Sequence, residues 1–114
     1  MIIETRRLTF TDESLLDAVK VALGSGVIKG PRLPVVRYEV PDVEGVMLRV
    51  LLRQGPPLGP LPLDLTMAQV AAVLINYCRF RRIPIPRSGK KKLLAQGNAV
   101  ILSITQELDT QKAA

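Results

Sequence analysis

The sequence of 114 residues contains no histidine, no tryptophan and a single cysteine. Without histidine the chain lacks the base of a Ser-His-Asp or Cys-His catalytic site, and it lacks imidazole metal ligands. One cysteine excludes both an internal disulfide and a zinc site built from cysteines. We therefore expect no metal, no cofactor and no enzymatic activity of these common kinds.

Long apolar runs are also missing. Residues 1–8 include Glu4, Arg6 and Arg7 and lack the apolar core of a secretory signal. Apolar stretches such as residues 70–75 are far shorter than the roughly 20 residues of a membrane helix. We expect a cytoplasmic protein that does not enter a membrane, and its lone thiol fits a reducing compartment.

Apolar residues make up 47% of the chain. That fraction is sufficient for a packed core, and the length is typical of one domain. We therefore expect residues 1–114 to form a single domain.

Residues 12–23 carry the spacing of an amphipathic helix. Thr11 is a suitable N-cap, and Gly24 and Gly26 end the pattern. The apolar residues at helical spacing are Leu15, Leu16, Val19, Ala22 and Leu23.

Two alternating runs then predict an antiparallel hairpin. Apolar residues occupy the even positions of residues 35–40 and again of residues 46–52, and residues 41–45 supply the turn. Residues 54–62 contain several prolines and glycines and predict an extended surface loop that divides the chain in half.

The second half predicts the same order of elements. Thr66 and Gln69 form a capping-box pattern before a helix that runs to about residue 81. Residues 92–96 and 99–106 predict a second hairpin, joined by Gly97 and Asn98.

If residues 2–10 and 61–65 are also strands, the order is β-α-β-β twice. This order predicts an α+β fold, a two-layer sandwich of two helices on a mainly antiparallel sheet. The half-repeats would be residues 1–54 and 61–108, related by pseudo-two-fold symmetry and joined by the proline-rich loop. Five identities at an offset of 55 support the repeat: Leu8 with Leu63, Thr11 with Thr66, Ile28 with Ile83, Pro31 with Pro86, and Arg32 with Arg87. A chance resemblance between two ordinary helix-hairpin units is the alternative.

The second helix is apolar on almost every side. Met67, Ala68, Ala72 and Ile75 widen its apolar face, so we expect it to be buried on more than one side. One interpretation is a central helix covered by sheet and loops; the other is a homodimer in which a second copy covers it.

The net charge of +6 is concentrated in one segment. Residues 65–106 contain no acid, and their bases are Arg79, Arg81, Arg82, Arg87, Lys90, Lys91 and Lys92. The structural interpretation is that the arginines complement the helix end and that the lysines protect an edge strand. The functional interpretation is a binding surface for an acidic protein or for nucleic acid, with Phe80 as a candidate stacking residue.

Cys78 is the one candidate nucleophile, and we expect it to be a buried structural thiol. We therefore predict a non-enzymatic protein-interaction or assembly module whose partner is a protein, including a second copy of itself. The alternative is nonspecific nucleic-acid binding through residues 79–92.

Overall fold

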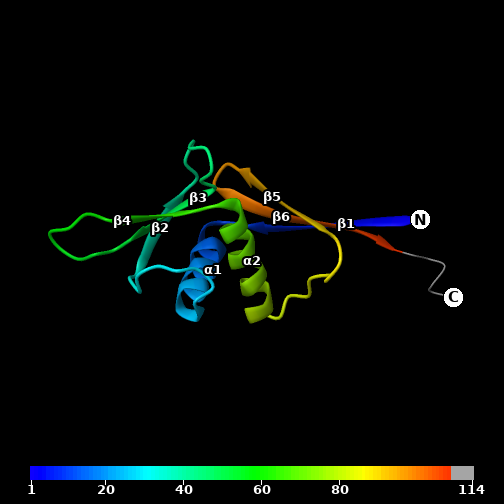
Figure 1. Ribbon diagram of the computed structural model, residues 1–114, viewed down its shortest axis with the longest axis horizontal. Helices are drawn as coiled ribbons and strands as arrows, with labels where there is room; N and C mark the ends of the chain where they lie inside the picture. Colours follow the sequence, from blue (N-terminus) through cyan, green and yellow to red (C-terminus); the bar gives the residue numbers. More distant parts are fainter. Residues whose placement is uncertain (109–114) are drawn as a thin grey trace.

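The computed structural model describes residues 1–108, which form two helices and six strands (Figure 1). In chain order these are β1 (Ile2–Phe10), α1 (Asp12–Ser25), β2 (Val35–Glu39), β3 (Leu48–Leu52), β4 (Leu61–Leu65), α2 (Met67–Phe80), β5 (Lys90–Gln96) and β6 (Ala99–Leu108). The predicted α+β class is confirmed. The strands, however, form two three-stranded antiparallel sheets and not the single sheet that we expected.

Local sequence explains where each helix begins and ends. At the start of α1, the Ser14 hydroxyl accepts a hydrogen bond from the Thr11 N–H at 2.9 Å. At the start of α2, the Thr66 hydroxyl accepts from the Gln69 N–H, and the Gln69 amide oxygen accepts from the Thr66 N–H. This is the predicted capping box. Gly26 ends α1 in the left-handed conformation, with φ of 80°.

Each sheet combines strands from both halves of the chain. The strand order is β1-β6-β5 in one sheet and β2-β3-β4 in the other. In the first sheet β1 pairs with β6 from Ile2 opposite Leu108 to Phe10 opposite Val100. Neither half therefore forms a complete sheet by itself.

Both predicted hairpins are present, with one correction in the first. β5 and β6 are joined at Gly97, whose φ is 60°, as the predicted two-residue turn requires. In β2 the register shifts between Val35 and Arg37. This bulge leaves Val36 exposed, although its even position had predicted burial.

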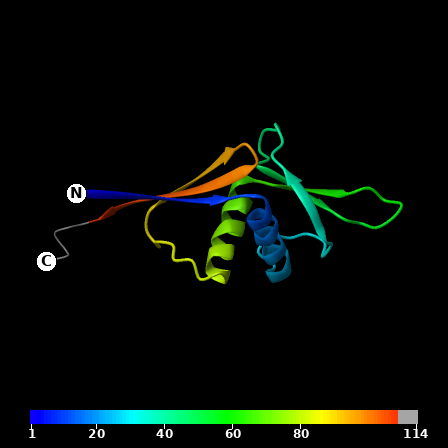
Figure 2. The same ribbon diagram turned by 180° about the vertical axis from the view of Figure 1, so that it is seen from behind.

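The core lies between the helices and the inner faces of the sheets. α1 and α2 lie side by side against the sheets in both views (Figures 1 and 2). The core takes completely or almost completely buried side chains from both helices and both sheets, including Leu15, Leu74, Val50 and Leu102. Burying each such side chain contributes about 1.5–3 kcal/mol.

The broad apolar face of α2 is buried on one side only. Val73 and Cys78 are buried, whereas Ala68 and Ala72 are exposed and Met67 is 58% exposed. Residues 1–108 therefore cover one face of this helix and leave Met67, Ala68 and Ala72 uncovered. Covering by a second copy stays a prediction.

The molecule is elongated, with extents of 65 × 28 × 20 Å. The paired ends of β1 and β6 project at one end, and the loop between β3 and β4 projects at the other (Figures 1 and 2). Neither helix within residues 1–108 has the length and apolar character needed to cross a membrane.

Candidate functional site

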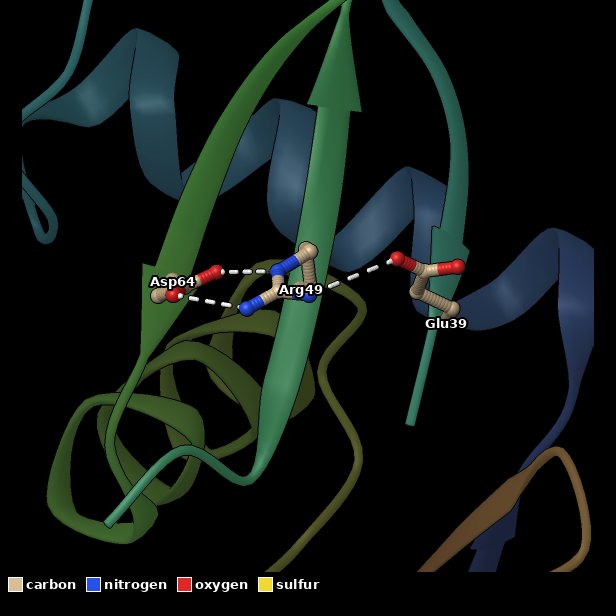
Figure 3. Close-up of polar contacts among 3 residues, drawn as sticks. All are labelled: Glu39, Arg49 and Asp64. Carbon is tan, nitrogen blue, oxygen red and sulfur yellow. Dashed lines mark hydrogen bonds and ion pairs between the residues drawn. The ribbon is translucent and has the colours of Figure 1, made fainter. Parts of the chain in front are cut away.

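The two sheets turn faces of different charge away from the helices. On the β2-β3-β4 sheet, Glu39, Arg49 and Asp64 lie opposite one another on the three strands (Figure 3). Arg49 donates to Asp64 from Nε to Oδ1 at 2.7 Å and from Nη2 to Oδ2 at 3.2 Å, and its Nη1 lies 3.8 Å from Glu39 Oε1. These hydrogen bonds lower the pKa of Asp64 and raise the pKa of Arg49. On this face the arginine is neutralised from both sides.

The corresponding face of the β1-β6-β5 sheet carries cations and hydroxyls. Arg7, Ser103 and Lys92 form one row across the three strands, and Thr5, Thr105 and Lys90 form the next. The row between them in register is Arg6, Ile104 and Lys91, and the row on the far side of Arg7 is Leu8, Leu102 and Leu93. Ile104, Leu102 and Leu93 are buried in the core, so both polar rows point outward. We call these six residues the basic sheet face: Thr5, Arg7, Lys90, Lys92, Ser103 and Thr105.

The cations of the basic sheet face are exposed, and within residues 1–108 the ion pairs involve only Arg49. The Thr5 and Thr105 hydroxyl oxygens are 3.3 Å apart. Beyond them lies a shallow pocket of about 570 Å³ lined by Ile3, Ser88, Gly89, Lys90, Thr105, Gln106 and Glu107. An exposed surface of Arg, Lys and hydroxyl groups suits an anionic partner, because all three groups donate hydrogen bonds to acidic oxygens.

The predicted residues at the end of α2 lie elsewhere. Arg79, Phe80, Arg81 and Arg82 are exposed where α2 ends, on the side of the molecule away from the sheets (Figures 1 and 2). The Arg81 guanidinium lies 5.9 Å from the centre of the Tyr77 ring.

Acids of α1 share a cleft of about 580 Å³ with Arg81. Glu13 and Asp17 line it, and the Tyr77 hydroxyl donates to Asp17 Oδ2 at 2.7 Å. That hydrogen bond raises the pKa of Tyr77. Arg81 therefore faces acids of its own chain, which weakens its role in binding an external anion.

Phe80 stacks on a neighbouring ring. Its side chain is 60% exposed, and its ring centre is 6.3 Å from that of Tyr77 at an interplanar angle of 19°. One face of Phe80 is thus already occupied, and the ring lies on the helix end, away from the basic sheet face.

Residues 81–89 connect the two groups of bases. Arg6 of β1 donates from Nη1 to the Pro84 carbonyl at 3.1 Å. Gly89 has φ of 126°, and a Cβ atom at this position would lie 3.0 Å from the Thr105 carbonyl oxygen. Glycine therefore allows the backbone to pass close to β6 just before β5 begins. Arg87 is exposed within the connection, and Lys91 is exposed on the inner side of β5.

Four of the six residues of the basic sheet face were not predicted from the sequence. Arg7 and Thr5 belong to β1, and Ser103 and Thr105 to β6. In β6, Ser103 and Thr105 alternate with the buried Leu102 and Ile104, which is the available sequence signal. The pairing of β1 with β6 is what brings them beside Lys90 and Lys92, and alternation does not record a partner strand.

Cys78 is completely buried, as expected of a structural thiol. Burial raises its pKa, opposed by the charge of Arg6. Within residues 1–108 no group of three or more cysteine, aspartate or glutamate side chains is arranged to hold a metal ion.

Comparison of the chain with known protein families, curated proteins and solved structures finds no significant match.

Proposed function

We propose that this chain is a non-enzymatic binding module that recognises an acidic protein through the basic sheet face. The observation that carries the proposal is the row Arg7, Ser103 and Lys92, which has two exposed cations and no acid. The matching face of the other sheet compensates its own charge through Glu39 and Asp64. Uncompensated charge on one sheet attracts an acidic surface and speeds association with it.

The chemistry of the face favours a protein over single-stranded nucleic acid. Single-strand binding surfaces combine cations with aromatic side chains on which bases stack. None of the paired positions of this face is aromatic, and Phe80 lies at the end of α2. Nucleic acid is the second candidate, because Arg, Lys, Ser and Thr are also the side chains that contact phosphates.

The position of Cys78 supports a role without catalysis. A reactive cysteine needs an accessible thiolate, whereas this thiol is buried and its pKa is raised.

Anisotropy titrations with a fluorescent deca-glutamate peptide and with short single- and double-stranded DNA test the proposal. We expect the peptide to bind with micromolar affinity at low salt, and the double variant Arg7→Glu, Lys92→Glu to weaken binding at least tenfold. The matched control is Arg37→Glu, Arg53→Glu, which changes the net charge equally but lies on the other sheet and just after it. It should weaken binding much less.

Equal losses in the two double variants would mean that net charge alone attracts the peptide, and would overturn the proposal. DNA binding that is tighter than peptide binding and steeply dependent on salt would replace it with the second candidate.

We also infer that the fold is two β-α-β-β repeats, which supports an assembly role. Both helices have 14 residues, and α2 begins and ends 55 positions after α1. β5 likewise begins 55 positions after β2. One sheet contains the β5-β6 hairpin of the second half and β1, the first strand of the first half. The other sheet contains the β2-β3 hairpin of the first half and β4, the first strand of the second half. Expressing residues 1–54 alone tests this: a symmetric folded dimer would support the repeat, and an unfolded chain at high concentration would contradict it.

A further inference from the structure

β5 is an edge strand with an unusual distribution of side chains. Its one partner within residues 1–108 is β6, so its other edge has no strand beside it. Lys90, Lys91 and Lys92 begin the strand, and Leu93, Leu94 and Ala95 follow. β5 lies along the upper border of the molecule in both views (Figures 1 and 2). One half of this edge is cationic and the other half is apolar.

A pocket of about 350 Å³ adjoins the apolar half. It is lined by residues of β5, by Met67 at the start of α2, and by Val40 and Val46 of the connection between β2 and β3. Met67 is 58% exposed and Leu94 is 48% exposed. A pocket lined in this way accepts an apolar side chain, because the transfer removes apolar surface of both partners from water.

We propose that β5 is the docking edge for an extended acidic peptide, which adds to the sheet as a fourth strand. Main-chain hydrogen bonds to the free edge of β5 hold the peptide, its acidic residues lie beside Lys90, Lys91 and Lys92, and an apolar side chain enters the pocket at Leu94. Strand addition of this kind takes affinity from the main chain and specificity from side-chain pockets. The inference rests on the proposed function and names the form of the acidic partner.

The side chains and main chain of the β5 edge favour an acidic peptide over a second copy of the chain and over nucleic acid. Pairing of β5 with β5 of a second copy would place six lysines on one seam, and lysines on an edge oppose such pairing. Nucleic acid supplies neither a ladder of amide groups nor an aliphatic side chain for the pocket. An acidic peptide supplies all three interactions.

The length of β5 sets the length of the peptide. Its cationic and apolar halves together have six residues, Lys90 to Ala95, which span roughly 20 Å at about 3.3 Å per residue. Acids must occupy one half of the peptide and apolar residues the other. The probes are therefore two capped hexapeptides, Glu-Glu-Glu-Val-Thr-Val and the reverse sequence, which separate parallel from antiparallel addition.

Hydrogen exchange of the full chain, followed by NMR, tests the inference. We expect one of the two peptides to slow exchange of alternate β5 amides at least tenfold, with little effect on β1, the other edge of that sheet. N-methylation of alternate peptide residues removes the donors on one side of the strand. We expect one alternate set of methyl groups to abolish binding and the other set to be tolerated.

A side-chain variant tests the pocket separately. Leu94→Glu should weaken peptide binding at least tenfold, because it puts an acid where the apolar side chain enters. Leu58→Glu, at an exposed position in the loop between β3 and β4, is the matched control and should have little effect. Thermal unfolding of both variants establishes that they are folded.

Each failure has its own signature. If acidic peptides bind and the Arg7→Glu, Lys92→Glu variant weakens them, but N-methylation has no effect and β5 amides gain no protection, the edge inference is wrong and the proposed function stands. If no acidic peptide binds at millimolar concentration, both are wrong. If β5 amides become protected as protein concentration rises without peptide, a second copy occupies the edge and the inference is overturned.

Discussion

Arg49 and Asp64 are joined by two hydrogen bonds across β3 and β4, in the side-by-side geometry that guanidinium and carboxylate groups favour. The pair lies on the outer face of its sheet, and both side chains are partly exposed. Its energetic effect is therefore best measured through the proton equilibrium of Asp64.

We expect Arg49→Gln to raise the pKa of Asp64 toward its ordinary value of 3.8. Folding lowers the pKa of Asp64, so its pairing with Arg49 stabilises the fold above about pH 4. This stabilisation is lost as the pH falls through the native pKa of Asp64. Carboxyl carbon NMR titration measures the change. Arg37→Gln removes an arginine without a hydrogen bond to Asp64 and should leave its pKa unchanged; equal shifts in both variants would contradict the pairing.

Leu102→Ala should reduce the free energy of unfolding by about 2–5 kcal/mol, because Leu102 is completely buried in the central strand β6 and its removal leaves a cavity. Urea unfolding followed by circular dichroism measures the loss. The control Leu58→Ala, at a side chain that is 64% exposed, should change stability by less than about 0.5 kcal/mol. A small loss at Leu102 would mean that the two sheets do not share this core.

Arg82→Gly should stabilise the protein by about 1 kcal/mol. Arg82 has φ of 57°, a left-handed conformation that costs a residue with Cβ about 1–2 kcal/mol and glycine almost nothing. The Arg82 N–H donates to the Arg79 carbonyl and the Ile83 N–H donates to the Cys78 carbonyl, so the conformation is part of the helix end. Arg79→Gly, in the last turn of α2, should instead destabilise by up to about 1 kcal/mol. Thermal unfolding of the two variants distinguishes these effects, and destabilisation by Arg82→Gly would contradict the geometry.

Tyr38 should ionise at about pH 12, above the ordinary pKa of 10.0, because its side chain is partly buried and its hydroxyl donates to Asp12 Oδ1 at 2.9 Å. The native pKa is raised, so this contribution to stability is complete below pH 10 and is lost as pH rises toward 12. Ultraviolet titration of the native and Tyr38→Phe proteins measures the ionisation. Urea unfolding at pH 9 and pH 11 should show a smaller decline in the variant. An ordinary pKa for Tyr38 would contradict both its partial burial and its hydrogen bond to Asp12.

Local structure was predictable where a few neighbouring residues determine it. Thr66 with Gln69 predicted the start of α2, and Gly97 with Asn98 predicted the last turn. Both depend on hydrogen bonds or dihedral angles within four residues, which the sequence displays directly.

The arrangement of strands was not predictable in the same way. Thr5 pairs with Thr105, and no local pattern records a partner that distant. The weak apolar pattern of β1 follows from this pairing, because Arg7 and Thr5 face solvent and the projecting end of β1 has little core beneath it. The same pairing assembled the part of the basic sheet face that sequence analysis missed.

Ile2 lies opposite Leu108, so the described backbone ends beside the place where it starts. β3 and β4 are antiparallel neighbours, as β1 and β6 are, but at the other end of the molecule the loop at residues 53–60 joins them. The path of the described backbone, residues 1–108, is therefore almost a closed ring. A permuted chain that is opened within the loop and joined across the β1 and β6 ends would retain every strand pairing. We therefore expect the architecture to depend on which strands are neighbours and not on their order along the chain.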